Sequence, residues 1–298
     1  MHDHSHENKR NIDRAFLIGI TLNALFVLIE VIAGFYINSL SLLSDAGHNL
    51  ADVASLALSL IAFRLLKVKP NKKYTYGYRK TTILVALLNA VVLLVSIGAI
   101  SFEAFHRLFK PEPLPGGVIA AVAGIGIIIN GFTALMFLKD KENDINIKSA
   151  YLHLMSDAVV SLGLVAGGII IFYTKLYWVD PLLSIAIAIV ILFGTWKLLR
   201  ESLRLTLDGV PRGINMKDVA DCASKVSGIE EIHHIHVWAL STTENALTAH
   251  LVLANEIDIK EESAIKDKLK HELEHLNISH VTLETERKDG GCVEPDCS

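Results

Sequence analysis

The sequence predicts a membrane protein of six transmembrane helices followed by a small α+β domain. Of the 298 residues, 51% are hydrophobic and only 20% are charged, and the mean hydropathy of +0.42 is high for a soluble globular protein. Six apolar segments are each long enough to cross about 30 Å of hydrocarbon as a helix. After Leu207 charged residues return, which marks the start of a soluble domain.

The predicted membrane domain spans residues 15–207 and follows a polar N-terminal segment, residues 1–14. His2, His4 and His6 in that segment either bind metal weakly or belong to a disordered hydrophilic start. We expect the six transmembrane helices over residues 15–37, 40–66, 81–105, 117–138, 149–173 and 179–199.

Lys and Arg are distributed unevenly between the connections of these helices. Those on one side of the membrane lie in residues 9–14, 64–80, 139–148 and 197–204. The connections on the opposite side carry only Arg107, Lys110 and Lys175. By the positive-inside rule, both the N-terminus and the C-terminus are expected in the cytoplasm.

The predicted soluble domain, residues 208–287, has the pattern helix, strand, strand, helix, strand. Its helices carry an apolar stripe and its strands alternate between apolar and polar residues. We expect these elements over residues 215–226, 232–240, 246–253, 260–276 and 280–286. The tail, residues 288–298, contains Cys292 and Cys297 and is expected to be mobile.

The bulk composition argues against several classes of protein. The net charge of −4 and the pI near 6.3 give no basic surface for nucleic-acid binding. Three cysteines in a chain of this length do not form a disulfide framework, which favours a reducing compartment.

Ionisable residues interrupt two of the predicted membrane helices at matching positions. Asp45, His48 and Asp52 are separated by three and then four residues, so they share one helical face with Asn49 beside them. In the fifth segment, His153 and Asp157 are again four residues apart, so the pattern His-x-x-x-Asp occurs twice. Ionisable residues at membrane depth are costly and usually mark a functional pathway.

Two facing His-x-x-x-Asp pairs offer two nitrogen and two oxygen ligands, a set suited to tetrahedral Zn²⁺. The charge of the ion would compensate Asp52 and Asp157, since no Lys or Arg lies in the middle of the spans. The absence of nearby cysteine argues against a soft Cu(I) site. The alternative is a set of interhelical hydrogen bonds. Three roles remain open for Asp45: a residue of the ion pathway, a group that supports the metal ligands, or a residue at the end of a helix.

Four motifs together resemble the cation diffusion facilitator family over nearly the whole chain. They are Asp45-Ala-Gly-His48-Asn-Leu-Ala-Asp52, Tyr76-Gly-Tyr with the later Leu-Leu-Asn89, His153-Leu-Met-Ser-Asp157 and His233-His-Ile-His236-Val-Trp238. The resemblance implies a homodimer with a ferredoxin-like, metallochaperone-type C-terminal domain and no cofactor. It implies export of divalent metal from the cytosol in exchange for protons, with Zn²⁺ the expected substrate and Co²⁺, Cd²⁺ or Fe²⁺ as alternatives.

The same resemblance implies roles for individual residues. His48, Asp52, His153 and Asp157 would form the transport site, and histidine at position 48 would go with a preference for zinc over cadmium. The connection after the fourth segment lacks the histidine-rich insert of many eukaryotic zinc transporters, which favours a bacterial member in the inner membrane. Because His and carboxylate ligands lose protons when they bind metal, we expect metal and protons to compete during alternating access.

The resemblance also implies a regulatory zinc site in the C-terminal domain, with candidates His233, His250, His280 and Glu286 and with His236 in second rank. The alternation of a strand places His234 and His236 on one side and His233 on the other. The alternative for each histidine is a solvent-facing or hydrogen-bonded core residue. Cys292 and Cys297 either bind metal or are free thiols.

Two other functions compete with transport. A membrane metallohydrolase could use the pattern His271-Glu-Leu-Glu-His275. We reject that site, because the two histidines are expected on the solvent side of an amphipathic helix. The second is a metal sensor that the membrane helices merely anchor. In such a protein the paired His-x-x-x-Asp motifs at membrane depth would have no function.

Overall fold

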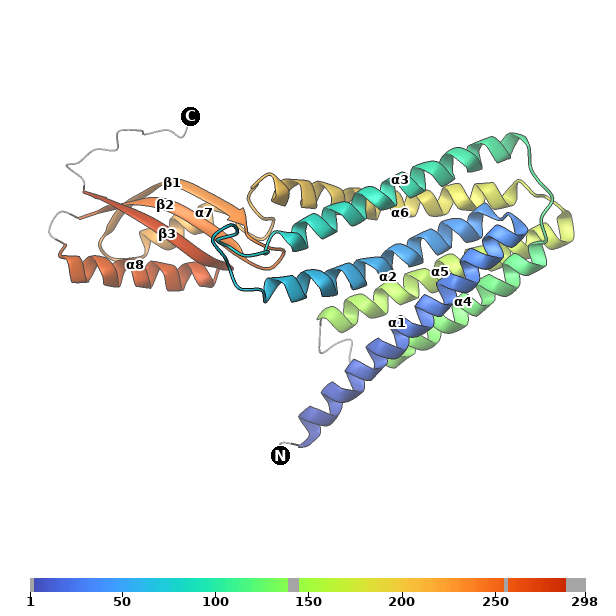
Figure 1. Cartoon of the computed structure of the whole chain (residues 1–298), viewed down its shortest axis with the longest axis horizontal. Helices are drawn as coiled ribbons and strands as arrows, with labels where there is room; N and C mark the ends of the chain where they lie inside the picture. Colours follow the sequence, from blue (N-terminus) through green and yellow to red (C-terminus); the bar gives the residue numbers. More distant parts are fainter. Residues whose placement is uncertain (1–2, 139–144, 255–256, 288–298) are drawn as a thin grey trace. The chain divides into compact units, whose positions relative to one another are not determined.

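The computed structural model describes residues 3–138, 145–254 and 257–287, and in this part of the chain six long helices precede a small α+β domain (Figure 1). The long helices are α1 (Asp3–Ile37), α2 (Leu40–Leu66), α3 (Thr81–Phe109), α4 (Gly116–Phe137), α5 (Ile145–Thr174) and α6 (Val179–Thr206). The domain consists of α7 (Met216–Ser224), β1 (Ile229–Ala239), β2 (Asn245–Leu253), α8 (Ile259–Glu274) and β3 (Ile278–Arg287). The predicted fold class is confirmed.

The long helices have the length and hydropathy of membrane spans. Among the described residues, five helices meet this description, with mean hydropathies from 2.0 to 2.8. The sixth, α2, has 27 residues, and its polar residues Asp45, His48 and Asp52 make it less apolar. Large apolar side chains such as Val95, Phe102 and others along these helices are exposed, as lipid-facing residues must be. The chain is therefore a multi-pass membrane protein.

Several helices are longer than their apolar segments. Helix α1 begins at Asp3, so the described part of the polar N-terminal segment is helical and continuous with the first apolar segment. The physical reason is that residues 3–14 contain neither Gly nor Pro, so nothing in the sequence ends the helix there. Helices α3 and α6 likewise continue beyond their apolar segments to Phe109 and Thr206.

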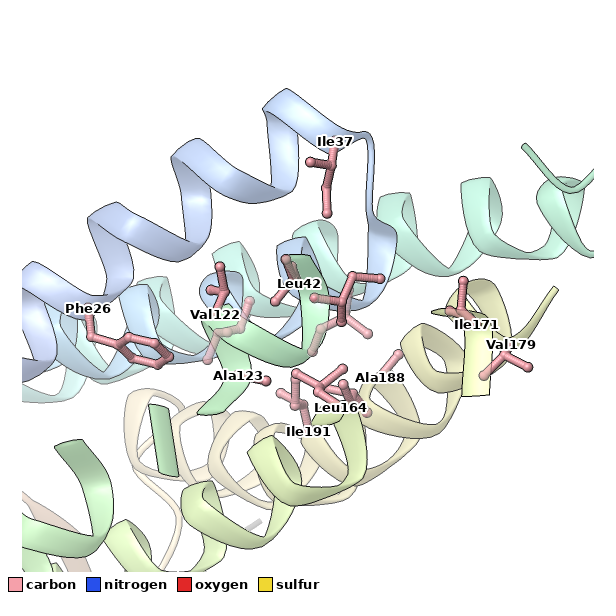
Figure 2. Close-up of a cluster of buried hydrophobic side chains, with 14 residues drawn as sticks. Phe26, Ile37, Leu42, Val122, Ala123, Leu164, Ile171, Val179, Ala188 and Ile191 are labelled. Carbon is pink, nitrogen blue, oxygen red and sulfur yellow. The ribbon is translucent and has the colours of Figure 1, made fainter. Parts of the chain in front are cut away.

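The described chain forms two compact units, one of Met1–Ala57 with Asn89–Lys197 and one of Leu58–Leu88 with Leu198–Ser298. In the first unit, buried apolar side chains from α1, α2, α4, α5 and α6 point into a common core, as Figure 2 shows. Helices α4 and α5 approach closely: a Cβ on Gly116 would lie 2.4 Å from the carbonyl oxygen of Gly168. Small residues thus allow the close helix packing that membrane bundles use.

The sheet of the second unit has the strand order β1-β2-β3. Strand β1 pairs antiparallel with β2, while β2 and β3 are parallel and joined through α8. Alternate residues of β2, from Leu247 to Leu253, are buried against α7 and α8, which cover one face of the sheet (Figure 1). The even-numbered residues of β2, His250 among them, therefore lie on the opposite face.

Helix α8 has a capped N-terminus and is hydrogen-bonded to the sheet. Asp258 and Glu261 form a capping box at its N-terminus. The Lys266 ammonium donates a hydrogen bond to Glu262, which lowers the pKa of that carboxyl, and the Thr285 hydroxyl of β3 adds a second hydrogen bond. These contacts fix α8 against β3.

Candidate metal centre

The two His-x-x-x-Asp pairs meet at one point between α2 and α5. The Nε2 atom of His48 lies 3.7 Å from a carboxylate oxygen of Asp52 and 3.7 Å from one of Asp157. The Nε2 atom of His153 lies 3.1 Å from Asp52 and 3.6 Å from Asp157. Each imidazole thus faces both carboxylates, and we call these four residues the ligand set.

The distances in the ligand set are mostly longer than hydrogen bonds, although the contact of 3.1 Å between His153 and Asp52 is within hydrogen-bond range. Three of the four contacts exceed the usual N–H···O range of about 2.7–3.2 Å. Two nitrogen and two oxygen donors around one point suit a divalent ion of intermediate softness. No Lys or Arg lies in the apolar parts of the membrane helices to neutralise the two aspartates. The arrangement can hold a cation with two positive charges.

Asp45 and Asn49 lie on α2 beside the ligand set but make different contacts. Asn49 donates a hydrogen bond from Nδ2 to the Oε2 atom of Glu30 on α1 at 3.0 Å. The carboxyl group of Asp45 is buried, and Asp45 lies one helical turn before Asn49 on the same face of α2. Of the alternatives for Asp45, the helix-end residue is excluded, because α2 begins five residues earlier at Leu40.

A second group of metal-type ligands lies on the open face of the sheet. His233, His250 and Glu286 each offer one ligand atom, and these atoms all lie within 4.8 Å of one another. The Nδ1 atom of His250 is 2.6 Å from Glu286, and the Nε2 atom of His233 is 3.5 Å from the same carboxylate. Strand register explains the grouping, since His233 pairs with His250 and Glu286 pairs with the nearby Val252. We call this the sheet cluster.

Two other sequence candidates lie outside the sheet cluster. His280 is on the same sheet face as Glu286 but six residues away along β3, roughly 20 Å for an extended strand. Its Nε2 atom lies 3.4 Å from the hydroxyl of Tyr76 instead. His236 pairs with Thr248 rather than with the residues near Glu286.

The expected alternation of the histidines on β1 is wrong. The register shifts between His233 and His236, and His234 has a positive φ of 48°. This β-bulge turns the His234 ring toward His250, with ring centroids 4.9 Å apart. His233 and His234 therefore both lie beside His250, which regular alternation does not allow.

Asp180 is a buried charged residue that sequence reasoning missed. It is 0% exposed and lies in the first turn of α6. Its carboxylate accepts hydrogen bonds from the backbone N–H of Leu40 and Ser41 and from the hydroxyls of Ser39 and Ser41. The sequence does contain a signal for this contact: an acidic residue lies at the start of one apolar span, and serines lie at the start of another. Asp180 connects the start of α2 to α6.

The remaining candidates do not form a site in the described residues. His271 and His275 are exposed on α8, which agrees with rejecting a protease site. Burial raises the pKa of the Cys222 thiol, which packs against the domain core. Cys292 and Cys297 lie outside the described residues, as does His2.

The bundle with its intramembrane ligand set defines the class of the protein as a membrane transporter of cations. Residues 16–206 match the family model described as the cation efflux transmembrane domain, and residues 211–288 match that of the cation efflux protein cytoplasmic domain. The chain belongs to the family of cation efflux proteins, the cation diffusion facilitators.

Curated relatives align over almost the full length. The "Cadmium, cobalt and zinc/H(+)-K(+) antiporter" of Bacillus subtilis is 35% identical over 285 residues, which are 95% of this chain and 91% of the relative. The "Metal cation efflux system protein CzcD" of Cupriavidus metallidurans is 35% identical over 95% of this chain and 89% of the relative. The "Zinc transporter ZitB" of Escherichia coli is 32% identical over 99% and 95%, respectively. By their names, these relatives are transporters and not enzymes.

Proposed function

We propose that the protein exports Zn²⁺ from the cytosol in exchange for protons, with Co²⁺, Cd²⁺ and Fe²⁺ as alternative substrates. The observation that carries this proposal is the convergence of the ligand set at membrane depth, where no Lys or Arg balances its two carboxylates. The printed names of the relatives, which include zinc and H(+) antiport, support the choice of metal and of counter-ion.

We assign His48, Asp52, His153 and Asp157 as the transport site. Histidine nitrogens and carboxylates bind a metal ion only when they are deprotonated. A proton that binds any of these atoms therefore weakens the hold on the metal, and the metal in turn displaces protons. If the site opens alternately to the cytosol and to the outside, this competition couples outward metal movement to inward proton movement.

The orientation follows from charge. The connections between α2 and α3 and after α6 carry most of the Lys and Arg, so we place these sides and both termini in the cytoplasm. The chain then lies in the bacterial inner membrane and the C-terminal domain samples cytosolic metal. We propose that the protein works as a homodimer, as the resemblance to the family implies.

The sheet cluster gives the C-terminal domain a regulatory role in this proposal. Its two imidazoles and one carboxylate would bind Zn²⁺ when cytosolic zinc rises. His236 and His280 are not part of this proposed site, because the strand register pairs His236 with Thr248 and the Nε2 atom of His280 lies 3.4 Å from the Tyr76 hydroxyl. At the sheet cluster the metal is a regulatory ligand whose binding follows the cytosolic zinc concentration. At the intramembrane site the metal is the transported substrate.

A flux assay tests the proposed function. Purified protein in liposomes should take up Zn²⁺ when a pH gradient is imposed, and His153→Ala should lower the initial rate by about 10–100-fold because one nitrogen ligand is lost. His106→Ala is the matched control, since His106 is an exposed histidine near the end of α3 that contacts Phe102. If His153→Ala takes up Zn²⁺ at the wild-type rate, the assignment of the transport site is wrong. If uptake by the wild type does not depend on the pH gradient, the proposed exchange with protons is wrong.

A further inference from the structure

Two buried acidic residues lie next to the ligand set without belonging to it. Glu30 on α1 is 0% exposed and Asp45 on α2 is 1% exposed. Glu30 is the only charged residue in the membrane-crossing part of α1, Ile18–Ile37. We call Glu30 and Asp45 the acid pair.

Two of the four carboxyl oxygens of the acid pair are buried without a hydrogen-bond partner in the described part of the chain. Oε2 of Glu30 accepts the hydrogen bond from Asn49. Oε1 of Glu30 and Oδ2 of Asp45 are buried and have no hydrogen-bond partner among the described residues. Asn49, which binds Glu30, lies four residues after Asp45 on the same face of α2, so the two carboxyl groups are neighbours. Two carboxylates only accept hydrogen bonds, so neither can satisfy the other unless one of them holds a proton.

The charges around the acid pair make such a proton necessary. Helix α2 contributes Asp45, with His48 and Asp52 further along, and α5 contributes Asp157. Helix α4, which packs on α1, has no titratable residue in Gly116–Phe137. No Lys or Arg lies within the apolar spans. Two neighbouring buried carboxylates with no cation are strongly disfavoured, because like charges repel and each loses its hydration.

We propose that the acid pair is a proton-binding site, separate from the metal ligands, that holds one of the exchanged protons. This inference rests on the proposed metal–proton exchange. Asp45 precedes His48 by three residues, about 4.5 Å along the helix axis. A divalent ion in the ligand set would favour the doubly ionised pair, so the proton leaves when metal binds and returns when metal departs.

Proton release on metal binding tests this proposal. Zn²⁺ titration calorimetry is done on the full-length His250→Gln/Glu286→Gln variant, in which the sheet cluster is disabled; this variant is the reference wild type, and all further changes are made in it. Titrations in K⁺-free detergent solution, repeated in two buffers of different ionisation enthalpy, give the number of protons released per ion bound at the ligand set. Glu30→Gln, Asp45→Asn and the double variant should each release about one proton fewer than the wild type, because one proton is shared by the pair. Zn²⁺ affinity should stay within about threefold of the wild type.

Glu103→Gln is the matched control, because Glu103 is an exposed acid on α3 paired with Arg107; it should release the wild-type number of protons. Unchanged proton release in Glu30→Gln and Asp45→Asn would overturn the proposal. Loss of Zn²⁺ binding in both, as in His153→Ala, would also overturn it by placing the pair among the metal ligands. If instead His153→Ala binds Zn²⁺ as the wild type does, it is the transport site that fails.

Discussion

At the scale of single residues, His48 is one of the two histidines of the proposed transport site, and we expect its chemistry to influence which metal is accepted. Its Nε2 atom faces Asp52 and Asp157 at 3.7 Å each. Imidazole nitrogen suits Zn²⁺, and the resemblance to the cation diffusion facilitators implies that histidine at this position goes with a preference for zinc over cadmium.

We expect His48→Asp to lower the ratio of zinc to cadmium uptake by about tenfold, which corresponds to about 1.4 kcal/mol in relative transition-state energy. The measurement is competitive uptake of the two metals into liposomes under one pH gradient. His106→Asp, which adds the same charge outside the ligand set, should keep the wild-type ratio. An unchanged ratio in His48→Asp would show that this position does not determine selectivity.

At the scale of elements, Asp180 joins the start of α2 to the start of α6. Its buried carboxylate accepts hydrogen bonds from two backbone N–H groups and two serine hydroxyls at residues 39–41. Four residues further along α6, Ser184 contacts Ser44 at 2.6 Å between the hydroxyl oxygens. This tie holds the helix that carries His48 and Asp52.

Asp180→Ala should lower the apparent melting temperature of the detergent-solubilised protein by roughly 5–10 °C, because several buried donors lose their acceptor. Glu112→Ala is the control: Glu112 is exposed and accepts a hydrogen bond from Asn38 in the same unit. A scanning fluorescence assay on both variants makes the comparison. Equal melting of Asp180→Ala and wild type would mean that the Asp180 contacts do not contribute to stability.

The sequence predicted helices and strands correctly where apolar residues recur at the regular spacing of a helix or of a strand. It placed α2 to within a residue, and the His-x-x-x-Asp spacing put the ligand set on two helical faces that the structure brings together. The prediction from sequence failed where the backbone departs locally from regular strand geometry. The bulge at His234 breaks strand alternation, and nothing in the side-chain pattern marks it.

Distance along an element and along the chain also limits what the sequence alone can predict. His280 and Glu286 do share a sheet face, as alternation predicts, but the length of β3 separates them. The role of Asp180 depends on a contact between residues about 140 positions apart, which spacing within one helix cannot reveal. Long-range contacts of this kind require the structure.

For the whole molecule, we predict two kinds of metal binding in one chain. We expect the ligand set in the bundle to hold the transported ion with two nitrogens and two oxygens. We expect the sheet cluster in the C-terminal domain to hold a second ion with two nitrogens and one oxygen from the protein. Both groups lack sulfur, so their spectra differ from those of cysteine sites.

Zinc X-ray absorption on the full-length double variant His250→Gln/Glu286→Gln reports on the ligand set alone, because the sheet cluster is then disabled. We predict one zinc ion per chain with nitrogen and oxygen neighbours at about 2.0–2.2 Å, scattering from two imidazoles, and no sulfur at about 2.3 Å. Adding His48→Ala and His153→Ala should abolish this signal. A sulfur shell, or an unchanged spectrum without the two intramembrane histidines, would contradict the account.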